Sequence, residues 1–268
     1  MTIALSTAGF WHHASFEETL FKIAQNGVKA IEFFPYPPHL QPASFSRYER
    51  VRIGRLLRQL GLRCTSAAFS VELNLLSLHS GLHDLAMSEF RRVIEIGAEL
   101  GAPYFVLAIG NRHGVLPAPL DATIDFICAE IYALADHAKR AGIKLALETL
   151  PSDFLTTGRS VMELIDRVGH PELGACYDCS NTFAHEDPAE GVKALSNKLF
   201  LVHVSDCWRN KWAHAAIGRG EIDFSAFSRA LDQIGYKGDV VYELMDGENP
   251  EPRITDGVRR LTEAGFRA

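Results

Sequence analysis

The chain has 268 residues, 47% of them hydrophobic and 22% charged, which is typical of a folded globular protein rather than a disordered or fibrous one. Its formal net charge of −6 at pH 7 argues against a nucleic-acid partner, because such surfaces usually carry a basic patch. The sequence shows neither an apolar run of the roughly 20 residues that span a bilayer nor a secretory signal, and its five scattered cysteines do not suggest a disulfide framework. We therefore expect a cytoplasmic protein.

Short β-branched or apolar runs alternate with longer amphipathic stretches along the whole chain. The first unit is a strand at residues 3–6, followed by a helix that begins at Ser15 and stops at Asn26-Gly27. Later strands are expected at residues 29–33, 63–67, 104–108, 144–148, 173–177, 200–203 and 239–243, and later helices at 48–60, 83–100, 121–141, 160–168, 188–196, 224–234 and 251–266.

Eight strand–helix units predict a parallel sheet, because each helix serves as the crossover to the next strand. The sheet could be an open, doubly wound one or a closed barrel. An open sheet of this kind usually carries a glycine-rich nucleotide motif after its first strand, and this sequence has none there. The length also suits one barrel of about 250 residues. We therefore predict an α/β fold, a single (β/α)8 TIM barrel, with residues 1–268 forming one domain.

Four polar residues stand at the ends of strands five to eight, where a barrel places its catalytic side chains. They are Glu148, Asp178, His203 and Glu243. One such residue alone is more often a loop anchor or an ion-pair partner. Burying three carboxylates together is costly without a counter-ion, and a divalent metal removes that cost. Three carboxylates and one imidazole predict one divalent metal ion, and they suit Mn, Mg, Co, Zn or Fe(II) without selecting among them.

The same residues carry a resemblance to a known family. The segments Leu147-Glu148, Tyr177-Asp178, His203-Val-Ser-Asp206, Gly218-Arg-Gly-Glu-Ile-Asp223 and Tyr242-Glu243 are similar to the sugar phosphate isomerase/epimerase superfamily of xylose isomerase-like TIM barrels. That group includes inosose isomerases, ketose 3-epimerases, hydroxypyruvate isomerase and dehydroshikimate dehydratases. Ala30-Ile-Glu32 and Glu72-Leu-Asn74 resemble it more weakly. In this family the matching Glu, Asp, His and Glu bind the metal, so the resemblance implies the same ligands here.

The resemblance implies a metal-dependent isomerase or epimerase of a small polyhydroxylated carbonyl compound, such as a sugar, a sugar phosphate or an inosose. The metal would chelate a carbonyl and the neighbouring hydroxyl, which acidifies the adjacent C–H bond and stabilises a cis-enediolate. Glu148 and Glu243 would then act as the acid/base pair on the two faces of the substrate. Relatives are often dimers or tetramers, so a homodimer or homotetramer is also implied as an option.

Four further residues are expected to bind the substrate. Asn181 stands where many relatives have a histidine, three residues after the metal-binding aspartate; its amide can bind a hydroxyl but cannot shuttle a proton at neutral pH. Arg209 and His214 follow strand seven and could hold a substrate oxygen or carboxylate, although Arg209 could instead form a loop salt bridge. Glu32 ends strand two at the same mouth, where it could bind substrate or support another site residue.

Other functions remain open at this stage. A dehydratase or lyase of the dehydroshikimate or inosose type would begin with the same enolate. A non-catalytic sugar-binding barrel is the alternative of another class. A nucleic-acid repair phosphodiesterase would need further histidines, and Ser66-Ala-Ala and Asn181 stand in their places. Gly218-Arg-Gly220 is the only candidate for a phosphate cradle, so the substrate could equally be unphosphorylated.

Overall fold

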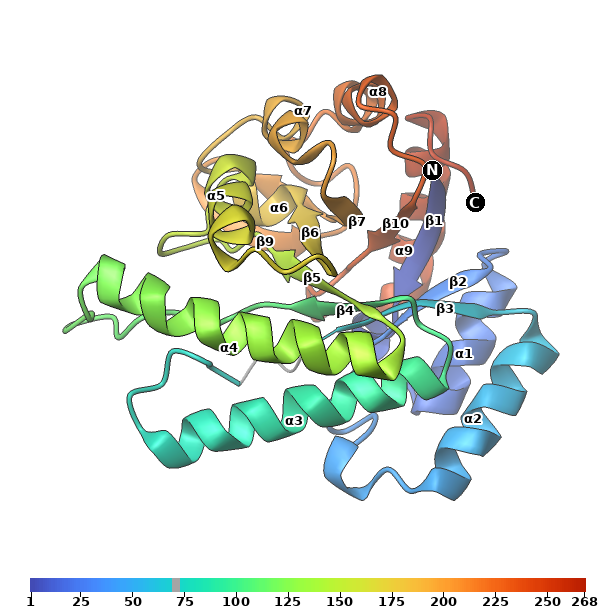
Figure 1. Ribbon diagram of the computed structural model, residues 1–268. Helices are drawn as coiled ribbons and strands as arrows, with labels where there is room; N and C mark the ends of the chain where they lie inside the picture. The colour runs from blue at the N-terminus through green and yellow to red at the C-terminus, as the bar shows by residue number, and fades with distance from the viewer. Residues whose placement is uncertain (69–72) are drawn as a thin grey trace.

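The computed structural model describes residues 1–68 and 73–268, so Glu72 lies outside the described residues. Within them, parallel strands close into an eight-stranded barrel in the order β1-β10-β7-β6-β5-β4-β3-β2 (Figure 1). The predicted (β/α)8 barrel is therefore confirmed. The barrel strands are β1 (Thr2–Ser6), β2 (Ala30–Phe33), β3 (Arg63–Ala68), β4 (Tyr104–Leu107), β5 (Lys144–Glu148), β6 (Leu173–Asp178), β7 (Leu199–Val204) and β10 (Asp239–Tyr242).

Helices surround the barrel on its outside (Figure 1). The first begins with a capping box, in which the Ser15 side chain accepts from the backbone N–H of Glu18 and the Glu18 carboxylate accepts from that of Ser15. The helices are α1 (Phe16–Gln25), α2 (Arg47–Leu60), α3 (Ser80–Glu99), α4 (Leu120–Ala141), α5 (Gly158–Val168), α6 (Cys179–Thr182), α7 (Pro188–Gly191), α8 (Phe224–Gln233) and α9 (Pro250–Glu263), with 3-10 turns η1 (Thr7–Phe10), η2 (Pro42–Ser44) and η3 (Val192–Leu195).

Two of the segments that differ from the sequence-based expectation follow β6 and β7. The helix expected at residues 188–196 is split into α7 and η3, where Gly191 lies so close to α5 that a Cβ on Gly158 would stand 2.3 Å from the Gly191 carbonyl oxygen. The loop expected after strand seven contains an antiparallel hairpin, β8 (Asp206–Trp208) and β9 (Lys211–Ala215). Its strands are only three and five residues long, too short for a clear periodic pattern.

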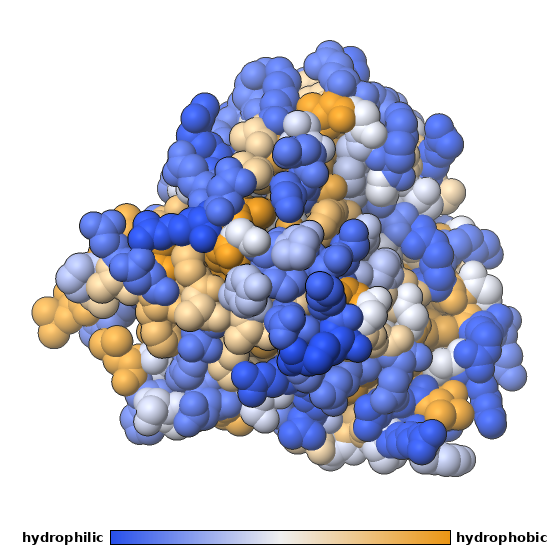
Figure 2. All heavy atoms as spheres, in the orientation of Figure 1, coloured by the Kyte–Doolittle hydropathy of each residue, from blue (hydrophilic) through white to orange (hydrophobic). Residues whose placement is uncertain are grey.

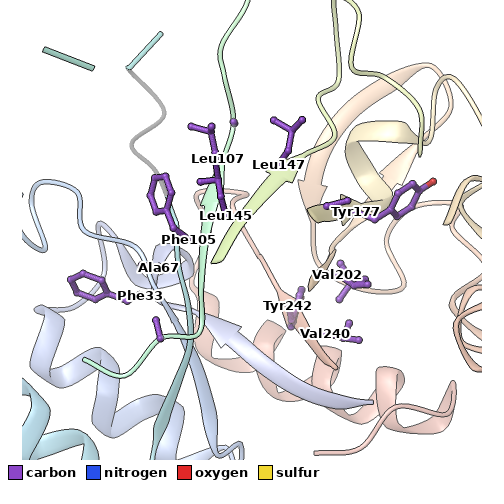
Figure 3. Close-up of a cluster of buried hydrophobic side chains, with 14 of the residues drawn as sticks. Phe33, Ala67, Phe105, Leu107, Leu145, Leu147, Tyr177, Val202, Val240 and Tyr242 are labelled. Carbon is purple, nitrogen blue, oxygen red and sulfur yellow. The ribbon is translucent and has the colours of Figure 1, made fainter. Parts of the chain in front are cut away.

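Alternate positions of the strands form two separate apolar clusters. Leu145 and Leu147 of β5 belong to the larger one, which lies between the barrel and the helices (Figure 3). Ala146, between them in sequence, belongs to a smaller cluster of mostly small side chains inside the barrel. This alternation is the period of two that a strand imposes. The polar side chains lie at the mouth of the barrel because they stand at the C-terminal ends of its parallel strands.

The two ends of the chain meet at the other end of the barrel. The backbone N–H of Ile3 donates to the carbonyl oxygen of Arg267 at 2.6 Å, and the backbone N–H of Arg267 donates to the carbonyl oxygen of Met1 at 3.1 Å. Hydrophilic side chains predominate on the face shown in Figure 2. Among the helices of the described residues, none combines the length and the hydropathy that crossing a bilayer requires.

Candidate active site

Four neighbouring strands bring the predicted ligands together. Glu148 and Asp178 are the last residues of β5 and β6, His203 lies next to the end of β7, and Glu243 directly follows β10. All four are at least 94% buried. Each offers one ligand atom, and these atoms lie within 4.8 Å of one another. The structure thus assembles the cluster that the sequence order indicated.

Asp178 shows why the cluster fits a cation. One carboxylate oxygen, Oδ1, accepts hydrogen bonds from the backbone N–H groups of Ser180 at 2.7 Å and Asn181 at 3.0 Å, at the start of α6. The other, Oδ2, is buried and has no hydrogen-bond partner among the described residues. A buried unpaired carboxylate oxygen is costly, and a metal ion would satisfy it. The donor set of carboxylates and one imidazole suits a divalent ion.

The two ring nitrogens of His203 face different carboxylates. Nδ1 lies 3.0 Å from Glu148 Oε1 and 3.5 Å from Glu243 Oε2. Nε2 lies 2.9 Å from Oε2 of Glu32, which is fully buried. The structure therefore places Glu32 against His203, a position consistent with the supporting role that its place in the sequence left open.

Burial and neighbouring charge shift the pKa values of the cluster. Burial raises the pKa of Glu148 from its ordinary 4.5 to about 7, and it also raises the pKa of Asp178. Burial acts on Glu243 in the same direction, but His203 outweighs it, so the pKa of Glu243 is lowered. For His203, burial favours the neutral ring, but Cys176 and the surrounding carboxylates raise its pKa well above 6.5. Without a metal, the cluster therefore retains protons near neutral pH.

His214 of β9 lies against the same cluster. Its Nδ1 is 3.4 Å from Glu243 Oε2, 3.9 Å from Asp178 Oδ2 and 3.0 Å from the hydroxyl of Ser205. The hairpin β8–β9 places the ring there, because it folds the chain back over the end of β7. The structure thus brings His214 to the site, where the sequence expected it.

Both amide atoms of Asn181 are engaged within the protein. Nδ2 donates to the backbone carbonyl of Thr149 at 3.0 Å, and Oδ1 accepts from the indole N–H of Trp212 at 2.8 Å. The Trp212 ring in turn meets the His214 ring edge to face, with centroids 5.4 Å apart. Asn181 therefore connects the end of β5 with the hairpin that carries His214.

Arg209, at the turn of the hairpin, makes contacts to the neighbouring loop. Its guanidinium donates to the carbonyl oxygens of Phe183 at 2.5 Å and Glu186 at 2.9 Å, and it lies 4.0 Å from the centre of the Phe183 ring. These contacts hold the hairpin to the segment after β6. Within the described residues, Arg209 makes this carbonyl and ring contact in place of the salt bridge that the sequence left open.

Asp206 organises the loop that contains Gly218-Arg-Gly220. Its carboxylate accepts from the backbone N–H groups of Gly218 at 2.7 Å and Ile222 at 3.2 Å. Gly218 has a φ of +89°, and a Cβ on Gly220 would stand 2.3 Å from the Cys207 carbonyl oxygen, so both positions require glycine. The glycines therefore serve a tight turn around a buried aspartate.

The sequence did not indicate the small hydroxyl residues that support the site. Ser66 donates to Glu32 Oε2 at 2.9 Å, and the Thr149 hydroxyl oxygen accepts from the backbone N–H of Asp178 at 2.9 Å. Ser205 contacts both His214 and Ser180. Serine and threonine occur throughout the chain, and only their place at the strand ends could have singled these out.

Comparisons with known proteins agree with the fold. A family model described as a xylose isomerase-like TIM barrel matches residues 20–264. A ketose 3-epimerase of Arthrobacter globiformis is 29% identical over 61% of this chain and 57% of its own length, so the match spans less than two thirds of that relative. An L-ribulose 3-epimerase of Methylomonas sp. (strain DH-1) is 24% identical over 94% of this chain and 86% of its own. A crystal structure of D-psicose 3-epimerase with D-tagatose from Clostridium cellulolyticum H10 superposes with a TM-score of 0.84 at 16% identity, covering 99% of this chain and 100% of that one.

Proposed function

Because the chain belongs to the xylose isomerase-like TIM barrel family, we propose that it is a metal-dependent isomerase or epimerase of a small polyhydroxylated carbonyl compound. Epimerisation next to the carbonyl of a ketose is the reaction that the site supports best. The observation behind this choice is the placement of two glutamates, Glu148 and Glu243, on the flanks of one buried cluster. The names of the ketose and L-ribulose 3-epimerase relatives support the same substrate class.

In this proposal Glu148, Asp178, His203 and Glu243 hold one divalent ion. When bound, such an ion supplies Lewis-acid polarisation of a substrate carbonyl and orients the neighbouring hydroxyl. The unpaired Oδ2 of Asp178 and the convergence of ligand atoms within 4.8 Å support the assignment. The residues do not select among Mn, Mg, Co, Zn and Fe(II).

Glu148 and Glu243 move the proton. β5 and β10 lie on either side of the pair β6–β7, so the two carboxylates approach the centre of the cluster from different sides. One carboxylate takes the proton from the carbon beside the carbonyl, and the C–H electron pair moves into the C=C bond of a cis-enediolate. The other glutamate, which starts as the carboxylic acid, then delivers its proton to the opposite face while the C=O bond forms again, and this inverts the carbon. Each glutamate has two oxygens, so one can bind the metal while the other handles the proton.

His214 is the substrate residue that the contacts favour. Its ring lies 3.4 Å from Glu243, close enough to share a substrate hydroxyl with that carboxylate. For Asn181 and Arg209, direct substrate contact is less well supported, because the atoms expected to bind substrate already serve Thr149, Trp212 and the loop carbonyls. We propose that these two residues shape the site by holding the hairpin.

We further propose that the substrate carries no phosphate at the glycine loop. The backbone N–H of Gly218 donates to Asp206, and that of Arg219 donates to the carbonyl of Ala216 at 3.0 Å. A phosphate cradle would need these two backbone N–H groups as free donors, and both already donate within the protein. A free ketose or inosose fits this loop better than a sugar phosphate.

Proton exchange in D2O tests the proposal. Purified protein, loaded in turn with Mn, Co, Mg and Zn, is incubated with a panel of ketoses, ketose phosphates and inososes, and the products are analysed by NMR. We expect deuterium at the carbon beside the carbonyl together with the epimer, and loss of epimer formation in the Glu148→Gln variant. A product that has lost water would favour the dehydratase alternative. Absence of bound metal, exchange and product across the panel would refute the enzymatic proposal.

A further inference from the structure

Glu32 is a buried acid beside the cluster that is not one of the four proposed ligands. It lies on β2, across the barrel from β7, and its side chain is fully buried. Its Oε2 stands 2.9 Å from His203 Nε2. A buried carboxylate oxygen needs a hydrogen-bond donor, and a ring N–H of His203 provides one for Oε2, whereas Oε1 has no hydrogen-bond partner among the described residues.

The other nitrogen of the same ring points into the cluster. His203 Nδ1 lies 3.0 Å from Glu148 and 3.5 Å from Glu243. A neutral imidazole has one N–H donor and one lone-pair nitrogen, and only the lone-pair nitrogen can bind a metal. A carboxylate at Nε2 keeps the proton there and leaves Nδ1 free for the ion.

Ser66 fixes the position of the carboxylate. Its hydroxyl donates to the same Oε2 of Glu32 at 2.9 Å. Glu32 and Ser66 are direct partners in the β2–β3 pairing, and the register shifts between Ile31 and Glu32. Both groups are therefore held by the sheet itself rather than by a loop, which makes their geometry rigid.

We propose that Glu32, held by Ser66, is a positioning residue that sets the tautomer and orientation of His203, so that Nδ1 is the metal-binding nitrogen. Glu32 lies behind the ring on the side away from Glu148 and Glu243, so it acts on the metal through His203 and does not touch the substrate. This inference rests on the proposed metal site and adds to it a specific ligand atom and its support.

The first experiment uses the wild-type protein labelled with 15N-histidine and loaded with Zn²⁺, which is diamagnetic. Two-bond 1H–15N correlations distinguish a protonated Nε2 from a protonated Nδ1. We expect His203 to carry its proton on Nε2 in the loaded protein. A proton on Nδ1, with Zn²⁺ on Nε2, would overturn the inference without any substitution. If wild-type protein binds none of Mn²⁺, Co²⁺ and Zn²⁺, the proposed metal site itself fails.

The second experiment measures metal affinity by titration with Mn²⁺ and Co²⁺. Loss of an outer carboxylate partner typically weakens binding about 10- to 100-fold, so Glu32→Ala should fall in this range. Glu32→Gln keeps an oxygen that accepts from Nε2–H, and its loss should be smaller, with Ser66→Ala showing the same direction. Glu186→Gln is the matched control, because Glu186 is a partly buried acid that bonds Tyr177 and Gly158 outside the cluster.

The pattern of the variants decides between positioning and general stability. A positioning role predicts weakened metal binding in folded Glu32→Ala, rescue in Glu32→Gln with the Nε2–H signal preserved, and unchanged binding in Glu186→Gln. Affinities within twofold of wild type in folded Glu32→Ala would contradict the inference while leaving the metal site intact. If Glu32→Ala does not fold, the NMR result on wild-type protein still decides the question.

Discussion

The indole N–H of Trp212 donates to the amide oxygen of Asn181 at 2.8 Å, and this bond joins the β8–β9 hairpin to the start of α6. Asn181 stands at the position where the family resemblance led us to expect a histidine. Its amide holds one tryptophan and one backbone carbonyl instead. Besides His203, the imidazole that lies against Glu243 is that of His214, which belongs to the hairpin.

Trp212→Phe removes the indole donor and leaves Asn181 Oδ1 without this partner. One lost neutral hydrogen bond corresponds to about 1 kcal/mol, or about a fivefold effect. We expect KM for the sugar to rise by about that factor with kcat little changed, because the hairpin is held less firmly but the proton-transfer groups stay in place. Steady-state kinetics check this. Trp208→Phe, a tryptophan at the other strand of the hairpin, serves as the control, and equal effects of both changes would contradict the role of this bond.

Glu148→Gln and Glu243→Gln should each lower kcat by about 10²- to 10⁴-fold, because a glutamine cannot take or give the proton. Both changes also weaken metal binding, so activity is compared at saturating Mn²⁺. Deuterium exchange from each of the two epimers separates the roles of the glutamates. If one glutamate serves each face, each variant loses exchange mainly with one epimer. Equal residual exchange with both epimers would count against a two-base mechanism.

The variants His214→Ala and His214→Asn distinguish proton transfer by the imidazole from a positioning role through its hydrogen bond. Asparagine can keep the hydrogen bond that His214 makes with Ser205 at 3.0 Å, whereas alanine cannot. If the imidazole carries or shares a proton with the substrate, both variants should lose about 10²-fold in kcat. Recovery of near wild-type kcat in His214→Asn would show that His214 only positions its neighbours. Titration with Mn²⁺ shows whether either change also affects the metal.

The stability of the metal-free protein should fall as pH rises from about 5 to about 8. The folded-state pKa values of Glu148 and Asp178 are raised by burial, so the folded protein binds more protons than the unfolded chain in this range. The raised pKa of His203 acts in the same direction, whereas the lowered pKa of Glu243 changes stability mainly below its ordinary value of 4.5, outside this range. Thermal unfolding in EDTA across this range measures the trend. A melting temperature that rises towards pH 8 would contradict it.

Added metal should reverse this trend. A divalent ion binds deprotonated ligands, so its affinity increases as pH rises through the pKa of Glu148, about 7. At a free concentration 100 times the dissociation constant, binding adds about 2.7 kcal/mol to the free energy of unfolding. Melting temperatures with and without Mn²⁺ should therefore diverge as pH rises. A constant difference between the two curves would argue against metal binding by these residues.

Most of what the sequence indicated about the candidate site came from the residues at the strand ends. Glu148, Asp178, His203 and Glu243 each close an apolar run, and a parallel barrel brings the ends of successive strands to one mouth. Their convergence was expected from the strand periodicity together with the prediction of a closed barrel, in which strands five to eight are neighbours. The helix start at Ser15 was equally legible, since an N-cap serine is a local signal, and the structure adds a capping box with Glu18.

The tertiary structure alone decided what the single polar residues do. Glu32 and His203 are 171 positions apart in the sequence. No local pattern indicates that the Glu32 carboxylate lies beside the His203 ring. The partners of Asn181 and Arg209 likewise depend on a hairpin too short to give a periodic signal. Sequence determines which residues reach the mouth of the barrel, because strand ends are set locally. Which of them meet is set by side-chain packing across the barrel, which only the folded chain contains.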